Sequence, residues 1–372
     1  MRSFYHYILL LFFLFSIDVR AEQINVDAYF KPENKPKIAD WLLEQIEKEF
    51  SFFQRGGAIS KSKISSLAND ECYSHLLLVK YSIENNEVYV SHKIPHHWLM
   101  IRVDSIKAAL QAICRIYPLP DMEFIVSMHD AVAEQLDVPL FVMAKHRENN
   151  TQILIPDFEA LRGAYQVLQG KDITRDVLYL WEERKNQMIW RGSTAQHSLA
   201  SHPLSFDLDD DHCISRVRLC RLSTQFPEMI DAKFTIYAQG AESIPSLEQF
   251  RGDFISYEDQ LRCKYQMLID GNTCSYSASG WRWFSDSLIF KEDSDQVQWY
   301  YNGLQPNIHY IPVQEGLGDL TEKLQWAGEH DEEAKAIARN AREFALNHIT
   351  QEMNFAYLYY TLSAYDELLK DE

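Results

Sequence analysis

The sequence predicts an α/β protein made of two Rossmann-like halves, with a domain boundary near residue 185. In the first half, residues 123–128 form a short and nearly continuous apolar run, which is typical of a strand buried in a parallel sheet. In the second half, strand and helix patterns alternate from Ile189 to Val313. Residues 172–185 are polar and are expected to form a helix that links the two halves.

Apolar periodicity predicts the elements of the first half: a helix over 36–50, hairpin strands at 75–81 and 86–91, a helix over 104–117, and strands at 123–128, 140–144 and 153–155. The hairpin turn is expected at residues 84–86, where Asn85 and Asn86 tolerate tight backbone geometry. Pro118 and Pro120 cannot continue the second helix and end it.

The second half follows the same logic: a strand through Ile189 and Trp190, a helix over 214–225, a strand at 287–290, and helices over 319–328, 331–347 and 352–369. The helix over 331–347 has the clearest apolar stripe of the chain, through Ala334, Ile337, Ala338, Ala341 and Phe344. These patterns give a second alternating α/β unit, followed by an aromatic terminal helix.

Charge narrows the range of partners. The chain of 372 residues carries a formal net charge of −18, so its surface as a whole repels nucleic acid and anionic membranes. We therefore expect no nucleic-acid partner. A nucleotide ligand would need a local basic pocket, which the arginines of the second half can provide.

The N-terminus has the features of a signal peptide. Arg2 precedes an apolar run over residues 7–17, and Ala21 closes a small-residue cleavage site. We expect cleavage after Ala21 and export of a mature chain without a transmembrane segment; an uncleaved anchor is the alternative. Export permits disulfides among the six cysteines, with Cys213–Cys220 and Cys263–Cys274 as candidate pairs, and buried free thiols are the alternative.

Two short segments point to a site. Asp130 follows the predicted strand at 123–128, at the end where open α/β sheets place their chemistry. A carboxylate there can act as a general base, although it can also cap a following helix. The turn at residues 270–272, near Arg282, offers backbone N–H groups and positive charge to a phosphate-bearing ligand.

Seven blocks, in this order, resemble those of one family: FQRGG at 53–57, LPDMEFIV at 119–126 with His129 and Asp130, WRGS at 190–193, PEMIDA at 227–232, CKY at 263–265, DGN at 270–272, and HYIPV at 309–313. Together they are similar to the CAP10-like glycosyltransferases of family 90, which include lipopolysaccharide-modifying enzymes and KDEL-motif protein O-glucosyltransferases. The blocks span most of the chain, roughly residues 50 to 350.

This resemblance implies the GT-B fold. Residues 22–185 would form the acceptor-side domain, residues 186–350 the sugar-nucleotide-binding domain, and residues 351–372 a C-terminal helix that packs back on the first domain. It also implies a metal-independent, inverting transfer of a glucose-like or xylose-like sugar from a UDP-sugar. The acceptor would be a hydroxyl of a glycan, a lipopolysaccharide or a protein serine. No cofactor is expected besides the UDP-sugar co-substrate.

The resemblance assigns the catalytic base to Asp130. The expected donor-binding residues are Arg191, Gly192, Ser193, Arg216, Lys264, Asp270, Gly271, Asn272, Ser275 and Arg282. A salt bridge is the alternative for Lys264, and a plain turn residue is the alternative for Asp270. One departure from the family pattern concerns Arg282, because the family places an arginine two residues after the serine that corresponds to Ser275. Either the loop has an extra turn and Arg282 takes that role, or the nucleotide contacts differ.

Other functions fit less well. The acidic run at 207–211 suggests a DxD metal site, but it lies in a polar loop next to helix-start signals, so no metal site is expected. The chain has no GxSxG motif of a serine hydrolase. A degenerate glycan-binding or nucleotide-sugar-binding protein of the same fold is the alternative. For an active enzyme, an ER lumen would supply UDP-sugar, whereas a bacterial periplasm would not.

Overall fold

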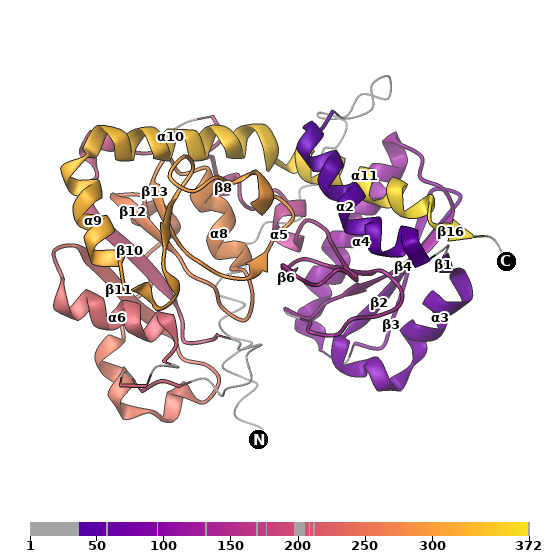
Figure 1. The fold of residues 1–372 in the computed structure, drawn as a ribbon, viewed down its shortest axis with the longest axis horizontal. Coiled ribbons are helices and arrows are strands. Elements are labelled where there is room, and N and C mark those ends of the chain that lie inside the picture. The colour runs from indigo at the N-terminus through magenta and orange to yellow at the C-terminus, as the bar shows by residue number, and fades with distance from the viewer. Residues whose placement is uncertain are drawn as a thin grey trace.

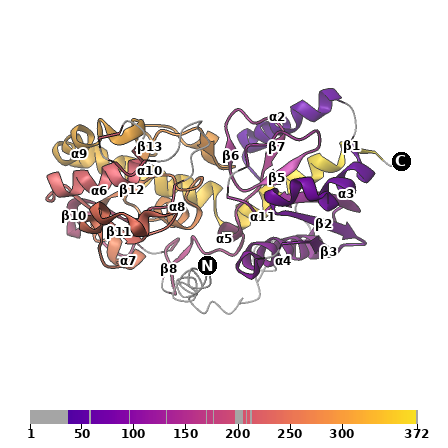
Figure 2. The same cartoon turned by 90° about the horizontal axis from the view of Figure 1, so that it is seen from below.

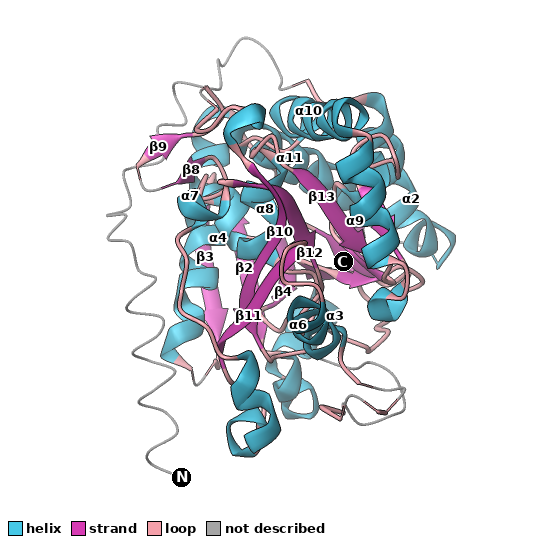
Figure 3. Ribbon diagram, turned by 90° about the vertical axis from the view of Figure 1, so that its left-hand side faces the viewer, coloured by secondary structure: helices cyan, strands magenta, loops and turns pink. Residues whose placement is uncertain are grey.

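The computed structural model describes residues 37–56, 59–94, 96–130, 132–168, 170–175, 177–196, 205–207, 209–210 and 213–370. The predicted signal peptide, residues 1–21, lies outside these ranges. Within them, no helix has the length and apolar character that crossing a bilayer requires. The chain forms a mixed α/β fold in which two five-stranded sheets are flanked by helices (Figure 3).

The first sheet is mixed and has the strand order β3-β2-β4-β5-β7. Its strands are β2 Leu78–Glu84, β3 Glu87–His92, β4 Met122–Ser127, β5 Leu140–Val142 and β7 Gln152–Leu154. β2 pairs antiparallel with β3 and β4, whereas β4, β5 and β7 run parallel. β4 is buried along nearly its whole length, which confirms the strand predicted at 123–128.

The predicted hairpin is confirmed, although its first strand lies three residues further along the chain than predicted and its turn is one residue shorter. Glu84 pairs with Glu87, so only Asn85 and Asn86 form the turn between β2 and β3. Their φ angles are 51° and 64°. Positive φ at both central residues is the geometry that matches the twist of the flanking strands, and asparagine adopts it more readily than most residues.

The second sheet is parallel throughout and has the order β11-β10-β12-β13-β15. Its strands are β10 Lys185–Ser193, β11 Ile230–Ile236, β12 Cys263–Leu268, β13 Leu288–Glu292 and β15 Ile311–Val313. Every side chain of β12 and β13 is buried, as expected for central strands covered on both faces. The carboxyl ends of these strands point to one edge, where the candidate site lies.

Helices cover both sheets. The first half contains α2 Asp40–Gly56, α3 Lys61–Asn69, α4 Met100–Ile116 and α5 Phe158–Leu161. The second contains α6 Ser215–Gln225, α7 Tyr257–Gln260, α8 Tyr276–Trp283, α9 Leu320–Glu329 and α10 Asp331–His348. Short pairs of strands complete the fold: β1 Ile59–Ser60 with β16 Leu369–Lys370, β6 Lys145–His146 with β14 Gln296–Val297, and β8 Val167–Leu168 with β9 Lys171–Asp172.

The chain returns to the first half at its end. α10 lies along the second half and contacts β13, and α11, Gln351–Asp366, then packs against α2, α4 and α5 of the first half (Figure 1). Its Tyr365 meets Phe141 of β5 edge-on, at 5.2 Å between ring centroids. The view from below shows β6 and α5 between the two groups of elements (Figure 2).

Apolar packing continues between the two sheets. One buried cluster contains the first sheet and α11 together with Trp281, Trp283 and Trp299 from the second half. Trp299 lies 4.5 Å from Tyr357 of α11, measured between ring centroids. A second cluster fills the space between the parallel sheet and its own helices. The shared cluster includes Met128, just after β4, and Leu268, at the end of β12.

The predicted linking helix over 172–185 is wrong. The described part of that segment contains β9 and a 3-10 turn at Trp181–Glu183. The Asp172 carboxylate accepts hydrogen bonds from the backbone N–H and the hydroxyl of Thr174, which favours a turn over a helix. The Arg184 guanidinium is buried and donates to the carbonyls of Tyr179 and Ser285, which fixes an extended path.

The two candidate disulfides are also wrong, because all six cysteines are free thiols. Cys263 begins β12 and Cys274 follows its other end. A strand rises about 3.3 Å per residue, so the strand alone separates them by more than the roughly 7 Å that a disulfide can span. Cys213 precedes α6 and Cys220 lies within it, and both are buried as apolar side chains. The alternative of free thiols is therefore correct.

Candidate active site

Asp130 lies just beyond the end of β4. The Ser127 hydroxyl donates to the carbonyl of Leu76 at 2.7 Å and accepts from the N–H of His129 at 3.1 Å, so the chain turns as the strand ends. Residues 132–139 form no helix, so the interpretation of Asp130 as a helix N-cap is wrong. Its carboxylate instead meets groups from two other segments.

Arg102 of α4 and Asn272 of the second half hold the two oxygens of Asp130. The Arg102 Nη2 lies 2.6 Å from Oδ1, and the Asn272 Nδ2 lies 3.0 Å from Oδ2. Burial alone would raise the pKa of Asp130, but the Arg102 charge and the hydrogen bonds from Asn272 and Arg102 outweigh it. The pKa therefore falls below its ordinary value, and Asp130 is a fixed, ionised carboxylate at neutral pH.

Asn272 connects the two halves. It belongs to the turn after β12, and its Oδ1 accepts from the Gln239 Nε2 at 2.9 Å while its Nδ2 donates to Asp130. Because the oxygen and the nitrogen of the amide each have a partner, its orientation is fixed. The Tyr276 hydroxyl, from the first turn of α8, also donates to the backbone carbonyl of Asp130, at 3.2 Å. The turn predicted to bind the donor thus lies directly against the predicted base.

Arg216 gathers several of the predicted donor residues around it. From the first turn of α6, it donates to the Asp270 carbonyl at 2.9 Å, to the Ser193 carbonyl at 2.9 Å and to the Ser275 hydroxyl at 3.3 Å. A Cβ on Gly271 would lie 2.7 Å from its Nη2, so a side chain at this position would displace the guanidinium. Burial lowers the pKa of Arg216 to about 10, and it stays a cation at neutral pH.

Arg282 is a second buried cation near Arg216. Its side chain is 2% exposed, lies over the ring of Trp281, and has an Nε without a hydrogen-bond partner among the described residues. Burial, together with the nearby Arg216 charge, lowers the pKa of Arg282 to about 10. A buried guanidinium is costly unless an anion compensates it. The carboxylates of Asp270 and Glu292 lie near Arg216, whereas no carboxylate among the described residues compensates Arg282, so Arg282 favours a ligand with negative charge.

Two charged residues of this cluster, Glu292 and Arg102, were not predicted from the sequence. Glu292, at the end of β13, accepts hydrogen bonds from the Ser215 hydroxyl and the Gly316 N–H, and burial raises its pKa to about 7. The strand predicted at 287–290 ends just before it, so the rule that selected Asp130 would have found it. Arg102 lies on a helix without any motif, and no local signal marks it.

The structure places two predicted donor residues elsewhere. Arg191 pairs with Asp231 at 2.9 Å and donates further to the carbonyls of Trp190 and Asp253. Lys264 pairs with Asp331 of α10 at 2.7 Å. Both cations hold the second half together and are not part of the cluster around Arg216. The salt bridge of Lys264 was the alternative left open by the sequence, whereas the partner of Arg191 was not predicted because a neighbouring strand supplies it.

Gly192 and Asp270, two further predicted donor residues, make close contacts within the second half. A Cβ on Gly192 would lie 2.4 Å from the Trp190 ring, so only glycine allows this packing. The Asp270 Oδ2 accepts from the Ser294 hydroxyl at 2.6 Å. Burial raises the pKa of Asp270 above its ordinary value, against the opposing charge of Lys291.

The acidic run at 207–211 falls partly outside the described residues, which include neither Leu208 nor Asp211. In the part of the chain that the structure describes, no three His, Cys, Asp or Glu side chains are grouped to hold a metal ion. The expectation that the reaction needs no metal stays a prediction.

Comparisons with known proteins agree with the motifs. The sequence model of Glycosyl transferase family 90 matches residues 43–372. The chain is 29% identical over 341 residues to Protein O-glucosyltransferase 2 of Danio rerio, covering 88% of this chain and 62% of that protein. It is 27% identical over 296 residues to Protein O-glucosyltransferase 3 of Homo sapiens, covering 78% and 55%. The chain thus spans less than two thirds of the length of these two relatives.

Proposed function

The chain belongs to glycosyl transferase family 90, and from this premise we propose that it transfers a glucose-like or xylose-like sugar from a UDP-sugar to a hydroxyl group. The favoured acceptor is a serine of a protein, since the similar proteins are named protein O-glucosyltransferases. A glycan or lipopolysaccharide hydroxyl is the other acceptor class. The contact between the carboxylate of Asp130 and the amide of Asn272, at 3.0 Å, carries the proposal.

In this proposal, Asp130 is the general base. The acceptor hydroxyl attacks the anomeric carbon as its proton passes to the Asp130 carboxylate, and the bond from that carbon to the diphosphate breaks on the opposite side. A single displacement of this kind inverts the anomeric configuration. The ion pair with Arg102 and the hydrogen bond from Asn272 fix the carboxylate, so little reorganisation is needed at the moment of transfer.

Arg216 and Arg282 would stabilise the leaving diphosphate. Guanidinium groups bind phosphate oxygens in a planar, two-pronged geometry, and both are buried, where their charge is weakly screened. The hydroxyls of Ser193 and Ser275 lie beside Arg216 and add donors. Two fixed cations supply the charge that a divalent ion supplies in other glycosyltransferases, which supports the metal-independent reaction that we propose.

We further propose that the two halves are the domains of a GT-B enzyme, with the acceptor bound by residues 22–185 and the donor by residues 186–350. The C-terminal segment from residue 351 would brace the first domain, in keeping with the contacts of α11 to α2 and α5. The enzyme would act after export, in a compartment that contains UDP-sugar, such as an ER lumen.

Nucleotide binding and turnover test the proposal. We expect UDP, but not GDP or ADP, to raise the melting temperature with and without EDTA; a ligand at about 100 times its dissociation constant adds roughly 2.7 kcal/mol. Asp130→Asn should keep this response and lower kcat for UDP-sugar turnover by roughly 10²- to 10⁴-fold. If no nucleotide stabilises the protein, the proposed transferase function fails and the alternative of a degenerate binding protein is favoured.

A further inference from the structure

A pocket lies away from the Asp130 cluster. It has a volume of about 560 Å³ and is formed by the start of α2, the loop between Asn302 and His309, and the C-terminal half of α10. In Figure 1, α2 and α10 lie along the upper side of the molecule. Its size falls within the roughly 300–1,000 Å³ of small-molecule sites. None of the residues assigned to donor or base lines it.

Aromatic rings form one side of this pocket. Trp41 stacks on Phe344 with 6.2 Å between ring centroids, and His348 meets the edge of Trp41 at 5.7 Å. A Cβ on Gly303 would lie 2.7 Å from both Phe344 and Trp41, so the rings pack tightly against the loop and have little freedom to move. Because these rings are already ordered, a ligand that binds to them causes little loss of side-chain conformational entropy.

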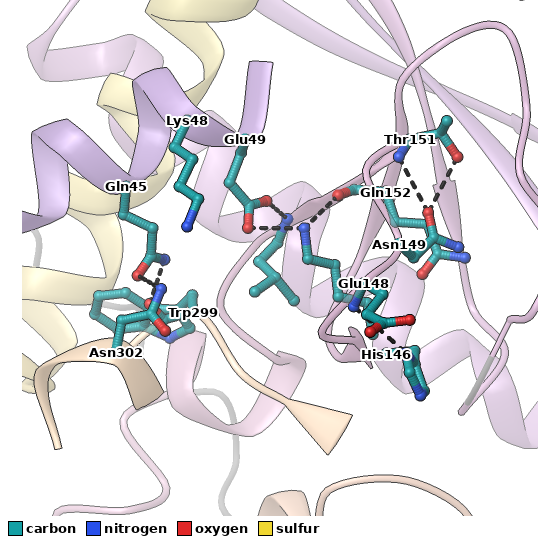
Figure 4. Close-up of polar contacts among 12 residues, drawn as sticks. Gln45, Lys48, Glu49, His146, Glu148, Asn149, Thr151, Gln152, Trp299 and Asn302 are labelled. Atoms are coloured by element: carbon teal, nitrogen blue, oxygen red, sulfur yellow. Dashed lines mark hydrogen bonds and ion pairs between the residues drawn. The ribbon is translucent and has the colours of Figure 1, made fainter. Parts of the chain in front are cut away.

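Amide side chains supply the polar groups. Asn302, Gln305, Asn340 and Asn347 all line the pocket. Asn302 donates to the Gln45 Oε1 at 3.0 Å, and Gln45 is itself fixed by a bond from its Nε2 to the Trp299 carbonyl (Figure 4). This arrangement leaves the Asn302 Oδ1 as an acceptor. Asn340 and Asn347 lie two turns apart on α10, are exposed, and offer both donors and acceptors.

Charge is scarce in the pocket. Among the described residues that line it, Glu343 is the only one with a full charge at neutral pH, and no lysine or arginine is present. The His309 Nδ1 accepts from the Gln305 N–H at 2.9 Å, which makes it a neutral imidazole with its proton on Nε2. Burial lowers the pKa of both His309 and His348, so both rings are neutral above pH 7. Such a lining disfavours phosphate and other anions.

We propose that this pocket binds a neutral oligosaccharide. A sugar ring has an apolar face of C–H groups, which fits an aromatic surface, and a rim of hydroxyls that both donate and accept hydrogen bonds. Amide side chains, of which Asn302 is held by Gln45, and a neutral histidine provide complementary partners without charge. The inference does not depend on the proposed transferase activity, because the pocket shares no residue with the Asp130 cluster.

The test is binding of maltopentaose, cellopentaose and mannopentaose to the purified protein, measured by saturation-transfer NMR and calorimetry up to about 10 mM. We expect at least one of them to bind, and Asn340→Ala combined with Asn347→Ala to weaken it roughly tenfold, from the loss of two hydrogen-bonding groups. Neither amide has a partner within the described part of the chain, so the fold should persist. Asn186→Ala, an exposed asparagine on β10, is the matched control and should bind as the unchanged protein does.

Three outcomes would overturn the inference. The first is that none of the three oligosaccharides binds. The second is that the double variant binds the oligosaccharide as tightly as the unchanged protein does. Loss of binding in the presence of saturating UDP, or in Asp130→Asn, would equally overturn it, because either result would place the sugar in the proposed active site. The third is that anionic oligogalacturonate binds as well as the neutral probes. Trp41→Leu, checked by its melting temperature, should also weaken binding.

Discussion

Two buried cationic sites in this molecule differ in how their charge is compensated. In the first half, Lys145 pairs with Glu49 at 2.8 Å, and each side chain is 8% exposed. Lys145 also donates to the carbonyl of Gln152, while Glu49 accepts from the N–H of Leu154 (Figure 4). In the second half, Arg282 has no carboxylate partner among the described residues, and its Nε is unsatisfied.

This difference separates a structural charge from one directed at a ligand. The Glu49–Lys145 pair is complete within the chain and connects α2 to the edge of the first sheet. A buried guanidinium without its own anion costs stability, and folding tolerates this where an anionic ligand restores the balance. The contrast favours Arg282 over Arg191 as a phosphate contact, although both were candidates from the sequence.

The largest expected effect comes from breaking the complete pair. Glu49→Gln leaves Lys145 buried without a counter-charge and should lower the free energy of unfolding by about 3–5 kcal/mol. Chemical denaturation measures this loss of unfolding free energy. UDP should still raise the melting temperature of the Glu49→Gln variant. Asp137→Asn, in the exposed pair with Lys63, is the control and should change stability by less than about 1 kcal/mol. Equal effects of the two variants would contradict the structural role of the buried pair.

The opposite result is expected at the second site. Arg282→Met removes a buried cation without a partner, so the unliganded protein should keep its stability or gain some. Its affinity for UDP should fall roughly 10- to 100-fold, because a hydrogen bond to a charged group contributes about 1.5–3 kcal/mol. Calorimetry gives the dissociation constant.

Arg191→Met is the matched control for this variant. Its guanidinium pairs with Asp231, so we expect a loss of stability and an affinity for UDP within about twofold of the unchanged protein. If Arg191→Met weakens UDP binding as strongly as Arg282→Met does, the distinction between the two kinds of cation is wrong.

The smallest expected effect concerns a carboxyl next to these cations. The pKa of Glu292 is about 7 in the folded protein and 4.5 as its ordinary value. The folded state thus holds this proton more tightly, so Glu292 contributes stability that is complete below pH 4.5 and lost as the pH rises to 7. Through Glu292, the free energy of unfolding should fall by at most about 1.4 kcal/mol for each pH unit.

Melting temperatures across this range, compared with those of Glu292→Gln, measure this contribution. Between pH 4.5 and 7, Glu292 should lower the stability of the unchanged protein. We expect the variant not to show this contribution. An unchanged pH profile would show that Glu292 does not titrate in this range.

Local patterns predicted most of the elements. The hairpin at Asn85 and Asn86 and the helices over 214–225 and 331–347 were found within one to three residues of their observed bounds. The linking helix over 172–185 failed because the Asp172 side chain satisfies backbone groups in a turn, and polar composition alone does not distinguish that turn from a helix.

The site was predicted in part. Asp130 and the turn at 270–272 were selected, and the structure brings the carboxylate and the amide of Asn272 together across 142 residues of sequence. Arg102, which holds the other oxygen of Asp130, was missed, since its helix position has no motif.

By itself, the sequence determined the α/β class, the hairpin turn, the amphipathic helices and the strand that leads to Asp130. Those features depend on side chains a few residues apart, whose spacing is set by the periods of helix and strand. Only the tertiary structure decided which cations have partners: Arg191 meets Asp231 and Lys264 meets Asp331, while Arg282 is buried without a carboxylate among the described residues. Burial and counter-charge come from segments far apart in sequence, and only folding brings those segments together.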